Sequence, residues 1–431
     1  MIIQVFVLII VFVLIAARQL SNKHLQLLQI KLLKTPVDKA LGLEIWHIML
    51  FGAVVVLLTG QISPVDAFHA INFDVIIFLF GMFVIGQAME QSGYLSHLSY
   101  KLFSKAKTVN HLLLLLLFGL GIASAFLMND TLAIIGTPVV LVLAAKNNIP
   151  PKILLLALAF SVTIGSVMSP IGNPQNLLIA INGNMSNPFG TFFYYLFLPT
   201  MICLFVAYFL LKFFYKDQLK NKPIRQEEGP IKNHRLASLS RFSLVIVILL
   251  IIVKIFVVVA AIPVDFRLTY ISLLAALPII IFSRKRPDIL RNIDWKTIVF
   301  FIAMFVLMGS VWQSGFFQAL IVSGHLSLLS IAVILLAGVL VSQFISNVPF
   351  VALYLPLLIH SGATGKELVA LAAGGTLAGN LFILGAASNI IIIQNSEKRS
   401  KETLTFIDFA KIGIPMTIID VIVYWFFLTI L

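Results

Sequence analysis

The chain has 431 residues, of which 60% are hydrophobic and only 11% charged, and its mean hydropathy is +1.06. A soluble domain of this length is much more polar, so most of the mass is expected to lie in a lipid bilayer. The net charge of +13 does not predict a nucleic-acid partner, because the excess of Lys and Arg is confined to loops between apolar runs. The single cysteine, Cys203, excludes an intrachain disulfide.

Apolar runs in chain order predict an all-α polytopic membrane protein, since a bilayer requires about 20 apolar residues per helix. The first run lacks the basic start of a signal peptide and is expected to be a retained span with its N-terminus outside. The runs of the first half are 1–17, 41–59, 73–90, 110–145, 152–182 and 192–215. A polar segment, 216–241, reads as a cytoplasmic linker. The runs of the second half are 242–261, 268–282, 297–312, 326–359, 367–395 and 411–431.

Four of these runs are interrupted by polar residues. Runs 110–145 and 326–359 are each divided by a polar tip and are predicted to be re-entrant helical hairpins. Runs 152–182 and 367–395 contain Gly, Pro, Asn and Ser and are predicted to be broken transmembrane helices. A helix can break at bilayer depth only where protein, ion or water replaces its lost hydrogen bonds, so each break is a candidate site.

The two halves are copies of each other. Residues 73–93 align without a gap on 295–315, so that Met82-Phe83-Val84 falls on Met304-Phe305-Val306. Further along, Asn129 and Pro138 match Asn347 and Pro356, and Thr163, Gly172 and Asn176 match Thr376, Gly385 and Asn389. Matched polar residues in the same order indicate an internal repeat and not a shared apolar composition.

The positive charges indicate that the two copies are inverted in the membrane. With the tip-bearing runs as hairpins and each other run as one crossing, all 30 Lys and Arg residues except Lys254, Arg267 and Lys366 fall on the cytoplasmic side. If a tip-bearing run instead crossed the membrane twice, the loops before and after it would stay on the same side. The charge distribution alone therefore does not establish that these runs are re-entrant. Both termini are then expected outside the cytoplasmic (inner) membrane. Inverted repeats are typical of secondary transporters, whose binding site lies where the copies meet.

The residues at the four interruptions form the candidate substrate and ion site. Unwound carbonyls and amide oxygens suit Na⁺, and the N-termini of half-helices attract anions. Alternatively, the Pro and Gly residues serve only to kink the helices and to let them pack closely, without forming a binding site. The candidates in the first half are Asn129, Asp130, Thr131, Gly172, Asn173, Gln175 and Asn176, and those in the second are Ser346, Asn347, Asn380, Ser388 and Asn389.

With these motifs the chain resembles the ion transporter superfamily, which includes arsenite permeases, sodium/proton antiporters, citrate permeases and divalent-anion/sodium symporters. The segments that carry the resemblance are FLMNDTLAIIGTPVVL, SPIGNPQNLLI, FISNVPFVALYLP and LGAASNIII. They are most similar to the arsenite-permease and anion-permease branch. The symporter branch has Ser-Asn-Thr at each hairpin tip, whereas here the tips read Asn129-Asp130-Thr131 and Ser346-Asn347-Val348. The resemblance implies an elevator transporter, usually a homodimer, whose tips and broken helices form one small-ion site with cation sites beside it.

Asp130 is the one ionisable residue of the four interruptions, and its repeat partner is Val348. An intramembrane carboxylate costs about 2.5–3.5 kcal/mol on insertion scales unless it pairs, binds a cation or takes a proton. One hypothesis is that Asp130 carries a coupling proton or binds a coupling Na⁺ together with Asn129, Asn173 and Asn176. The other is that it caps the second hairpin arm. Two further ionisable residues, Lys254 and Asp420, lie inside spans, either as an ion pair or with Lys254 reaching the lipid edge.

The sequence therefore predicts a secondary active transporter that moves a small carboxylate or oxyanion together with Na⁺ or H⁺. Since the candidate site contains no Arg or Lys, a highly charged anion is disfavoured, and neutral arsenous acid fits equally well. An arsenite efflux permease or a Na⁺/H⁺ antiporter are the alternatives, and an ion channel is a weaker one. A membrane enzyme is disfavoured, because the sequence has no HExxH zinc motif, GxSxG elbow or Gly-rich phosphate loop and no close His, Asp and Glu cluster. No cofactor other than the coupling ion is expected.

Overall fold

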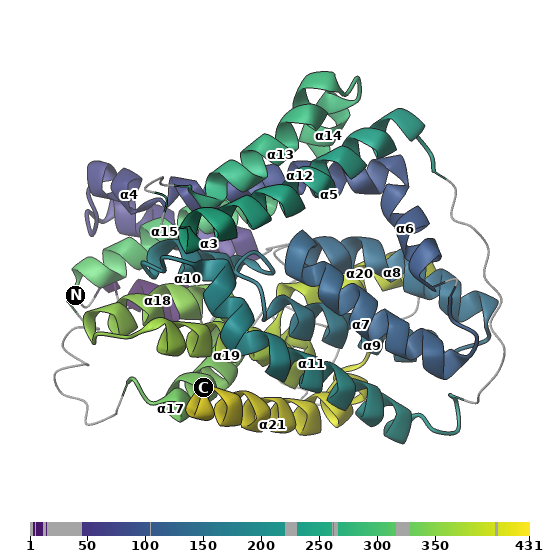
Figure 1. Ribbon diagram of the computed structural model, residues 1–431. Helices are drawn as coiled ribbons and strands as arrows, with labels where there is room; N and C mark the ends of the chain where they lie inside the picture. The colour runs from purple at the N-terminus through teal and green to yellow at the C-terminus, as the bar shows by residue number, and fades with distance from the viewer. Residues whose placement is uncertain are drawn as a thin grey trace, which may run out of the picture.

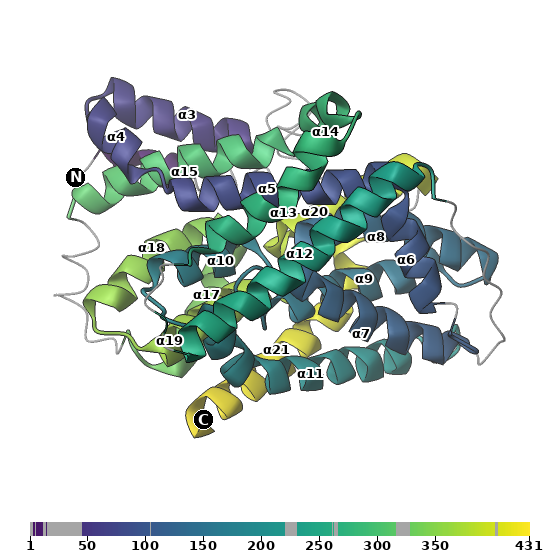
Figure 2. The ribbon, with the colours of Figure 1, turned by 45° about the horizontal axis from the view of Figure 1, so that its top comes forward.

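The structure is a computed structural model that describes residues 3–4, 6–11, 14, 45–103, 105–219, 231–260, 262, 266–315, 328–400 and 404–431. It is nearly all-helical, as the sequence predicts, and the helices fall into two layers (Figures 1 and 2). Parts of the expected first span and of the expected linker lie outside the described residues.

One layer, here called the scaffold, is made of helices that come before the hairpin in each half. They are α3 (Ile45–Leu58), α4 (Pro64–Ala70), α5 (Phe73–Ser92), α12 (His234–Val259), α13 (Leu268–Phe282), α14 (Arg286–Asn292) and α15 (Trp295–Gln313). Each half packs one helix on the other half, since α5 of the first half packs on α13 of the second and α15 of the second half packs on α3 of the first. The α5–α13 contact is close, because a Cβ atom at Gly81 would lie 2.8 Å from Ser272.

The other layer, here called the core, contains the hairpins and the broken helices. Its first half comprises α7 (Val109–Leu127), α8 (Asn129–Lys146), α9 (Pro151–Ser166), α10 (Pro174–Asn182) and α11 (Pro188–Phe214). Its second half comprises α17 (Ile331–Ile345), α18 (Asn347–His360), α19 (Gly365–Leu381), the 3₁₀ turn η2 (Ile383–Gly385), α20 (Ala387–Ser400) and α21 (Phe406–Ile430). A connecting helix, α6 (Tyr94–Phe103), joins the scaffold to the core.

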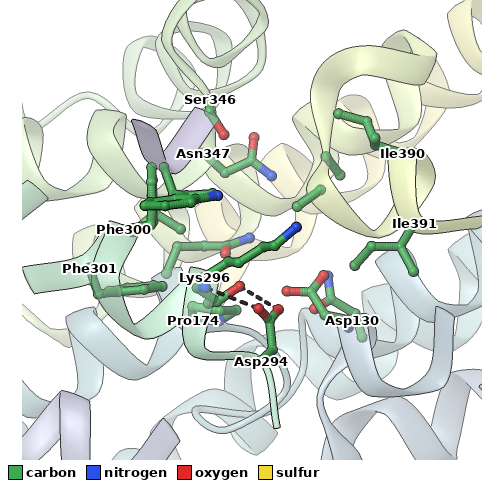
Figure 3. A pocket seen from close by; sticks show the side chains of 17 residues that line it. Asp130, Pro174, Asp294, Lys296, Phe300, Phe301, Ser346, Asn347, Ile390 and Ile391 are labelled. Atoms are coloured by element: carbon green, nitrogen blue, oxygen red, sulfur yellow. Dashed lines mark hydrogen bonds between the residues drawn. The ribbon is translucent and has the colours of Figure 1, made fainter. Parts of the chain in front are cut away.

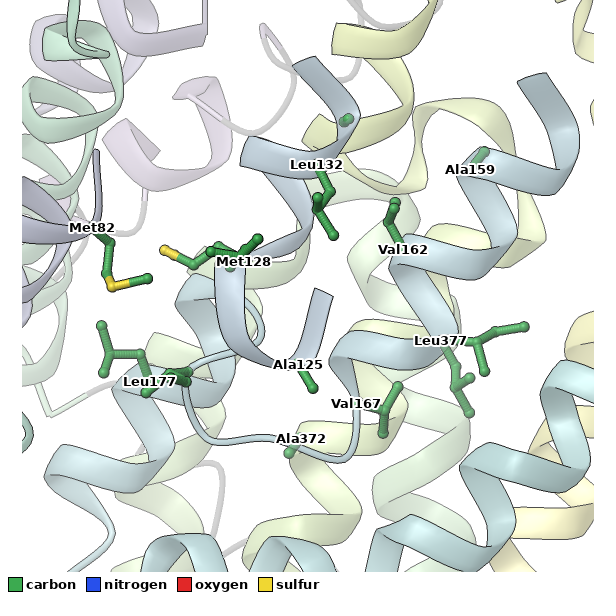
Figure 4. Close-up of a cluster of buried hydrophobic side chains, with 14 of the residues drawn as sticks. Met82, Ala125, Met128, Leu132, Ala159, Val162, Val167, Leu177, Ala372 and Leu377 are labelled. Carbon is green, nitrogen blue, oxygen red and sulfur yellow. The ribbon is translucent and has the colours of Figure 1, made fainter. Parts of the chain in front are cut away.

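Each hairpin turns at a single residue in an unusual conformation. Met128 between α7 and α8 has φ 64° and ψ 140°, and Ser346 between α17 and α18 has φ 72° and ψ 159°. These two residues occupy equivalent positions of the repeat, directly before Asn129 and Asn347. Side chains other than glycine rarely adopt this region, at a cost of about 1–3 kcal/mol, so the surrounding packing must hold both tips in place. Met128, for example, lies in a buried apolar cluster near Met82 of α5 (Figure 4).

The breaks lie inside the ranges that the sequence predicts to be broken helices. The first break separates α9 from α10 at residues 167–173, and the second separates α19 from α20 around η2. Inside the core, the first arm of each hairpin meets a broken helix at glycines. A Cβ atom at Gly165 would overlap Gly121, and one at Gly338 would lie 2.6 Å from Gly374.

Three short helices and one helix start differ from the sequence prediction. The helices α4, α6 and α14 were not expected, because each is too short or too polar to stand out from the loops around it. Helix α12 begins at His234, inside the segment predicted to be linker, because the side chain of Asn233 accepts the backbone N–H of Leu236 and caps its first turn.

Seven helices of the described chain are long and apolar enough to cross a membrane, namely α5, α7, α8, α11, α12, α15 and α21. Large apolar side chains are exposed along α11, α12 and α21, among them Phe209, Ile252 and Ile422. An exposed apolar surface of this extent is stable in lipid and not in water. The chain is therefore a multi-pass membrane protein. The opposite orientation of its halves across the bilayer, the re-entrance of the hairpins and the exact domain limits stay predictions.

Candidate functional site

A cavity of about 290 Å³ lies where the two hairpin tips, the two helix breaks and the scaffold meet (Figure 3). Both halves of the core contribute to its wall, through Asn129 and Asp130 on one tip and Ser346, Asn347 and Val348 on the other. The broken helices contribute Pro174, Gln175, Ala386, Ala387, Ile390 and Ile391, and the scaffold contributes Trp46, Asp294, Lys296, Thr297, Phe300 and Phe301.

Five of the twelve residues predicted from the sequence line this cavity: Asn129, Asp130, Gln175, Ser346 and Asn347. The other seven lie around it in positions that support the tips and the breaks. Thr131 faces the scaffold, since a Cβ atom on Gly86 of α5 would lie 2.8 Å from its Cγ2. The remaining six are Gly172, Asn173, Asn176, Asn380, Ser388 and Asn389, all in or beside the two breaks.

The first hairpin tip is attached to the first break by the backbone. The N–H of Asn129 donates to the carbonyl of Gly172 at 2.9 Å, and the side chain of Asn129 accepts the N–H of Asp130. Gly172 lies in close contact with the end of α9, because a Cβ atom there would lie 2.3 Å from the carbonyl oxygen of Ser166. The unwound chain can approach the helix this closely only with glycine.

Two asparagine side chains hold the first break in shape. Asn173 caps α10 by accepting the N–H of Asn176 at 2.9 Å, and its amide donates to Ser166 and Thr376. The Asn176 amide donates to the carbonyls of Ser166, Val167 and Ser169 at the end of α9. These bonds replace those that the helix loses where it unwinds. Both Asn side chains are fully buried, and the groups they bond are groups of the protein.

Thr376 connects the second half to the first break. Its hydroxyl accepts from the amides of Asn173 at 3.1 Å and Gln175 at 3.3 Å, and donates to Asn176 Oδ1 at 3.2 Å. Gln175 lines the cavity, so this threonine positions a cavity residue from the opposite half. The sequence had identified Thr376 only as the repeat partner of Thr163.

The second break is less completely hydrogen-bonded than the first. The Asn389 amide donates to the carbonyl of Gly379 at 2.7 Å, and the Asn380 amide donates to Asp420 at 3.1 Å. Four buried oxygens around this break have no hydrogen-bond partner: Thr163 Oγ1, Asn380 Oδ1, Ser388 Oγ and Asn389 Oδ1. The repeat equivalent of Asn173 here is Ala386, which cannot brace the break in the same way.

Asp130 lies in the first turn of α8 and faces the cavity (Figure 3). Its Oδ1 is buried without a hydrogen-bond partner, as is Oδ1 of Asn347 on the other tip. The backbone N–H of Asp130 is accepted by Asn129, and the position before the helix, Met128, provides no side-chain cap. Unpaired buried acceptors are costly, and two that face one cavity are suited to binding a cation or a proton donor.

The scaffold part of the cavity was not predicted. Asp294 caps α15 by accepting the N–H and the hydroxyl of Thr297, at 3.0 Å and 2.6 Å. Lys296 is exposed at the rim of the cavity, which corrects the expectation that the site contains no Lys or Arg. Because the sequence presents both residues as part of a charged loop, its pattern cannot show that this loop lies against the hairpin tips. The one available signal is the repeat, which aligns Asp294 with the cap residue Asn72 of α5.

Comparison with known proteins places the chain among membrane transporters. Residues 32–374 match the sequence family described as "CitMHS: Citrate transporter". A protein of Mycobacterium leprae described as a 46 kDa membrane protein is 27% identical over 395 residues, covering 86% of this chain and 90% of its own. A protein of Oryza sativa subsp. japonica named silicon efflux transporter LSI3 is 27% identical over 442 residues, covering 86% of this chain and 89% of its own.

A solved structure shares the fold. The crystal structure of the YdaH transporter of Alcanivorax borkumensis, described as having an unusual topology, superimposes with a TM-score of 0.56. The match covers 82% of this chain and 84% of that one at 14% sequence identity. At this identity the likeness concerns the path of the chain and not the substrate.

Proposed function

Because this chain belongs to the citrate transporter family and is a membrane transporter, we propose that it moves a small anion across the cytoplasmic membrane, coupled to Na⁺ or H⁺. The anion is a carboxylate or an oxyanion. The core layer carries it by an elevator movement against the scaffold, in a homodimer whose chains each have both termini outside.

The observation that carries this proposal is the composition of the cavity wall. Both tips, both breaks and the scaffold meet around about 290 Å³, a volume at the lower limit of ligand pockets and thus suited to a small solute. Lys296 supplies a positive charge for an anion, and the amides of Gln175 and Asn347 supply hydrogen-bond donors. Two carboxylates on the same wall, Asp130 and Asp294, favour a cation that is carried with the anion.

Asp130 is the residue that we assign to the coupling ion. It belongs to the moving core, whereas Asp294 is fixed in the scaffold by its bonds to Thr297. A carboxylate that travels with the substrate can carry a proton or Na⁺ across with it. Asp130→Asn should therefore abolish the dependence of transport on pH or Na⁺, and unchanged dependence would assign the coupling to another residue.

A neutral substrate is the second candidate. The amides of Asn129 and Asn347 and the hydroxyl of Ser346 suit arsenous acid, and one relative is named as an efflux transporter of silicon. An arsenite efflux permease would use the same cavity without requiring Lys296. If Asp130 binds only cations, the protein is instead a Na⁺/H⁺ antiporter.

Flux into proteoliposomes separates these functions. The purified protein is supplied with labelled carboxylates, oxyanions, arsenite, silicic acid and Na⁺ under an imposed pH gradient, an imposed Na⁺ gradient or neither. Accumulation of one anion above equilibrium under only one gradient supports the proposal and identifies the coupling ion. Flux that merely equilibrates, with no response to either gradient, would indicate a channel and contradict it.

A further inference from the structure

A second carboxylate is buried in the core, away from the cavity. Asp420 lies on α21 and is 0% exposed. Its Oδ2 accepts the side-chain amide of Asn380 at 3.1 Å. Asn380 belongs to the last turn of α19, directly before the second break, so Asp420 contacts the broken helix at the residue where it begins to unwind.

The single hydrogen bond between Asp420 and Asn380 leaves one oxygen of each side chain unsatisfied. Asp420 Oδ1 and Asn380 Oδ1 are both buried without a partner, although the other polar atom of each group is bonded to its neighbour. Two acceptors in this arrangement cannot satisfy each other. One proton on Asp420 Oδ1 supplies the missing donor, and the acid and the amide then form a closed pair with two hydrogen bonds.

Among the described residues, no positive charge lies close enough to Asp420 to compensate it. The titratable groups that face Asp420 are the thiol of Cys203 on α11, which is a weak hydrogen-bond donor to the carboxylate, and the hydroxyl of Tyr424 on α21, which is paired with Thr200 at 2.6 Å. Charged residues of the described elements packed against α21 lie at helix ends, and those of α21 itself lie in its first two turns. They are Lys212, Lys366, Glu367, Asp408 and Lys411. An ionised carboxylate without a cation is expensive at this depth, so the neutral acid is favoured.

The position of Asn380 connects this pair to the transport site. Helices α19 and α21 meet closely there, because a Cβ atom at Gly413 would lie 2.3 Å from the carbonyl oxygen of Asn380. The break that follows Asn380 leads within a few residues to Ala386 and Ala387 in the cavity wall. A change in the bond between Asp420 and Asn380 therefore acts on the backbone that forms this part of the wall.

We propose that Asp420 and Asn380 form a proton-binding site, separate from Asp130, that fixes the second helix break to α21 when Asp420 is protonated. Loss of the proton opens the acid–amide pair and releases the break. Binding of the proton does not depend on which solute is carried, whereas its use in coupling rests on the proposed function.

Infrared difference spectroscopy tests the site without measuring transport. The protein in liposomes is titrated with pH, and the carbonyl stretch of a protonated carboxyl is compared in wild type, Asp420→Asn and Asp408→Asn. Asp408 is the control because it lies at the start of the same helix, with its side chain 28% exposed. A carboxyl band that titrates in wild type and Asp408→Asn but is absent from Asp420→Asn is expected. An Asp420→Asn spectrum that keeps every titrating carboxyl band of the wild type would overturn the proposal, and a band that is lost only in Asp130→Asn belongs to Asp130.

A second measurement uses the unmodified chain, in case Asp420→Asn does not fold. Cys203 is the only cysteine and lies beside Asp420, so its S–H stretch is a single reporter of charge on that carboxyl. The S–H band should shift with the same pH midpoint as the carboxyl band. An S–H band that is insensitive to pH while the protein stays folded would contradict proton binding. A shift of the S–H band that Na⁺ produces at constant pH would contradict proton binding and show instead that the site binds Na⁺.

Discussion

At the scale of single residues, the cavity combines charge from the scaffold with polar groups from the core. The single lysine of its wall, Lys296, is exposed at the rim, whereas Asn129 and Asn347 are buried at the tips. Rim charges act mainly on the capture of a charged solute and are weakened by salt, while buried polar groups decide which solute fits.

Lys296→Gln should weaken the uptake of an anion and leave a neutral solute unaffected. An exposed ionic contact contributes at most about 1 kcal/mol, so KM should rise up to about fivefold, and the effect should disappear at high salt. Initial rates in proteoliposomes at low and high ionic strength measure this. The control is Lys285→Gln, since Lys285 is exposed at the start of the preceding scaffold helix, α14, and does not line the cavity. An equal loss of neutral arsenous acid transport would show that Lys296 acts on structure and not on charge.

The two equivalent threonines should respond differently to substitution. Thr376→Val removes the partner of three buried amide groups and should destabilise the protein by about 1–3 kcal/mol. Thr163→Val should be close to neutral, because the hydroxyl of Thr163 is buried without a partner. Thermal unfolding in detergent compares the two variants, which change the same atoms at matched positions of the repeat. Equal losses of stability would mean that the bonds of Thr376 do not hold the first break.

At the scale of elements, the hairpin tips store backbone strain. Ser346 adopts φ 72° and ψ 159°, a region in which glycine is unstrained. Ser346→Gly should therefore be more stable than Ser346→Ala by about 1 kcal/mol or more, although both lose the hydroxyl. The unfolding temperatures of the two variants measure the difference. A glycine variant that is no more stable than the alanine variant would show that packing at the tip relieves the strain.

The hairpins and breaks are the elements that the sequence predicts best, because polar residues inside an apolar run have few explanations in a membrane. Asn129 and Asn347 could be placed at tips, and Asn173 and Asn176 at a break, from this reasoning and from the repeat. The amides of Asn173 and Asn176 donate hydrogen bonds to other groups of the protein. The sequence could not predict this, because these bonds depend on where the unwound backbone lies. Trp46, Asp294 and Lys296 could not be predicted to line the cavity, because contact between separate layers leaves no periodic signal.

The hydrogen-bond partner of Asp420 could not be predicted from the sequence either. The sequence identifies a carboxylate inside a span and offers Lys254 as a partner. The structure instead gives it Asn380, the residue before the second break. Amides are common in this chain, so their pairing with a carboxylate could not be identified by residue type. The sequence already places Asn380 at the second interruption, and only the three-dimensional arrangement reveals that Asp420 of α21 lies beside it.

At the scale of the whole molecule, the two layers meet where α5 and α15 of the scaffold pack on α8, α10 and α18 of the core. One close contact is between Gly86 on α5 in the scaffold and Thr131 on α8 in the core. A Cβ atom at Gly86 would lie 3.8 Å from Cβ of Thr131, which is the mean separation in a disulfide. The only native cysteine, Cys203, is buried, so a cysteine pair introduced here would react without interference.

Gly86→Cys together with Thr131→Cys should form a disulfide that holds the core in the position seen in this structure. If transport requires the core to move along the scaffold, oxidation should stop flux almost completely and reduction should restore it. Binding of the substrate to the oxidised protein should persist, because neither Gly86 nor Thr131 lines the cavity. The two single variants under the same oxidant control for the loss of Gly86 and Thr131. Full flux through the cross-linked protein would exclude relative movement of the two layers at this contact and, with it, the elevator mechanism.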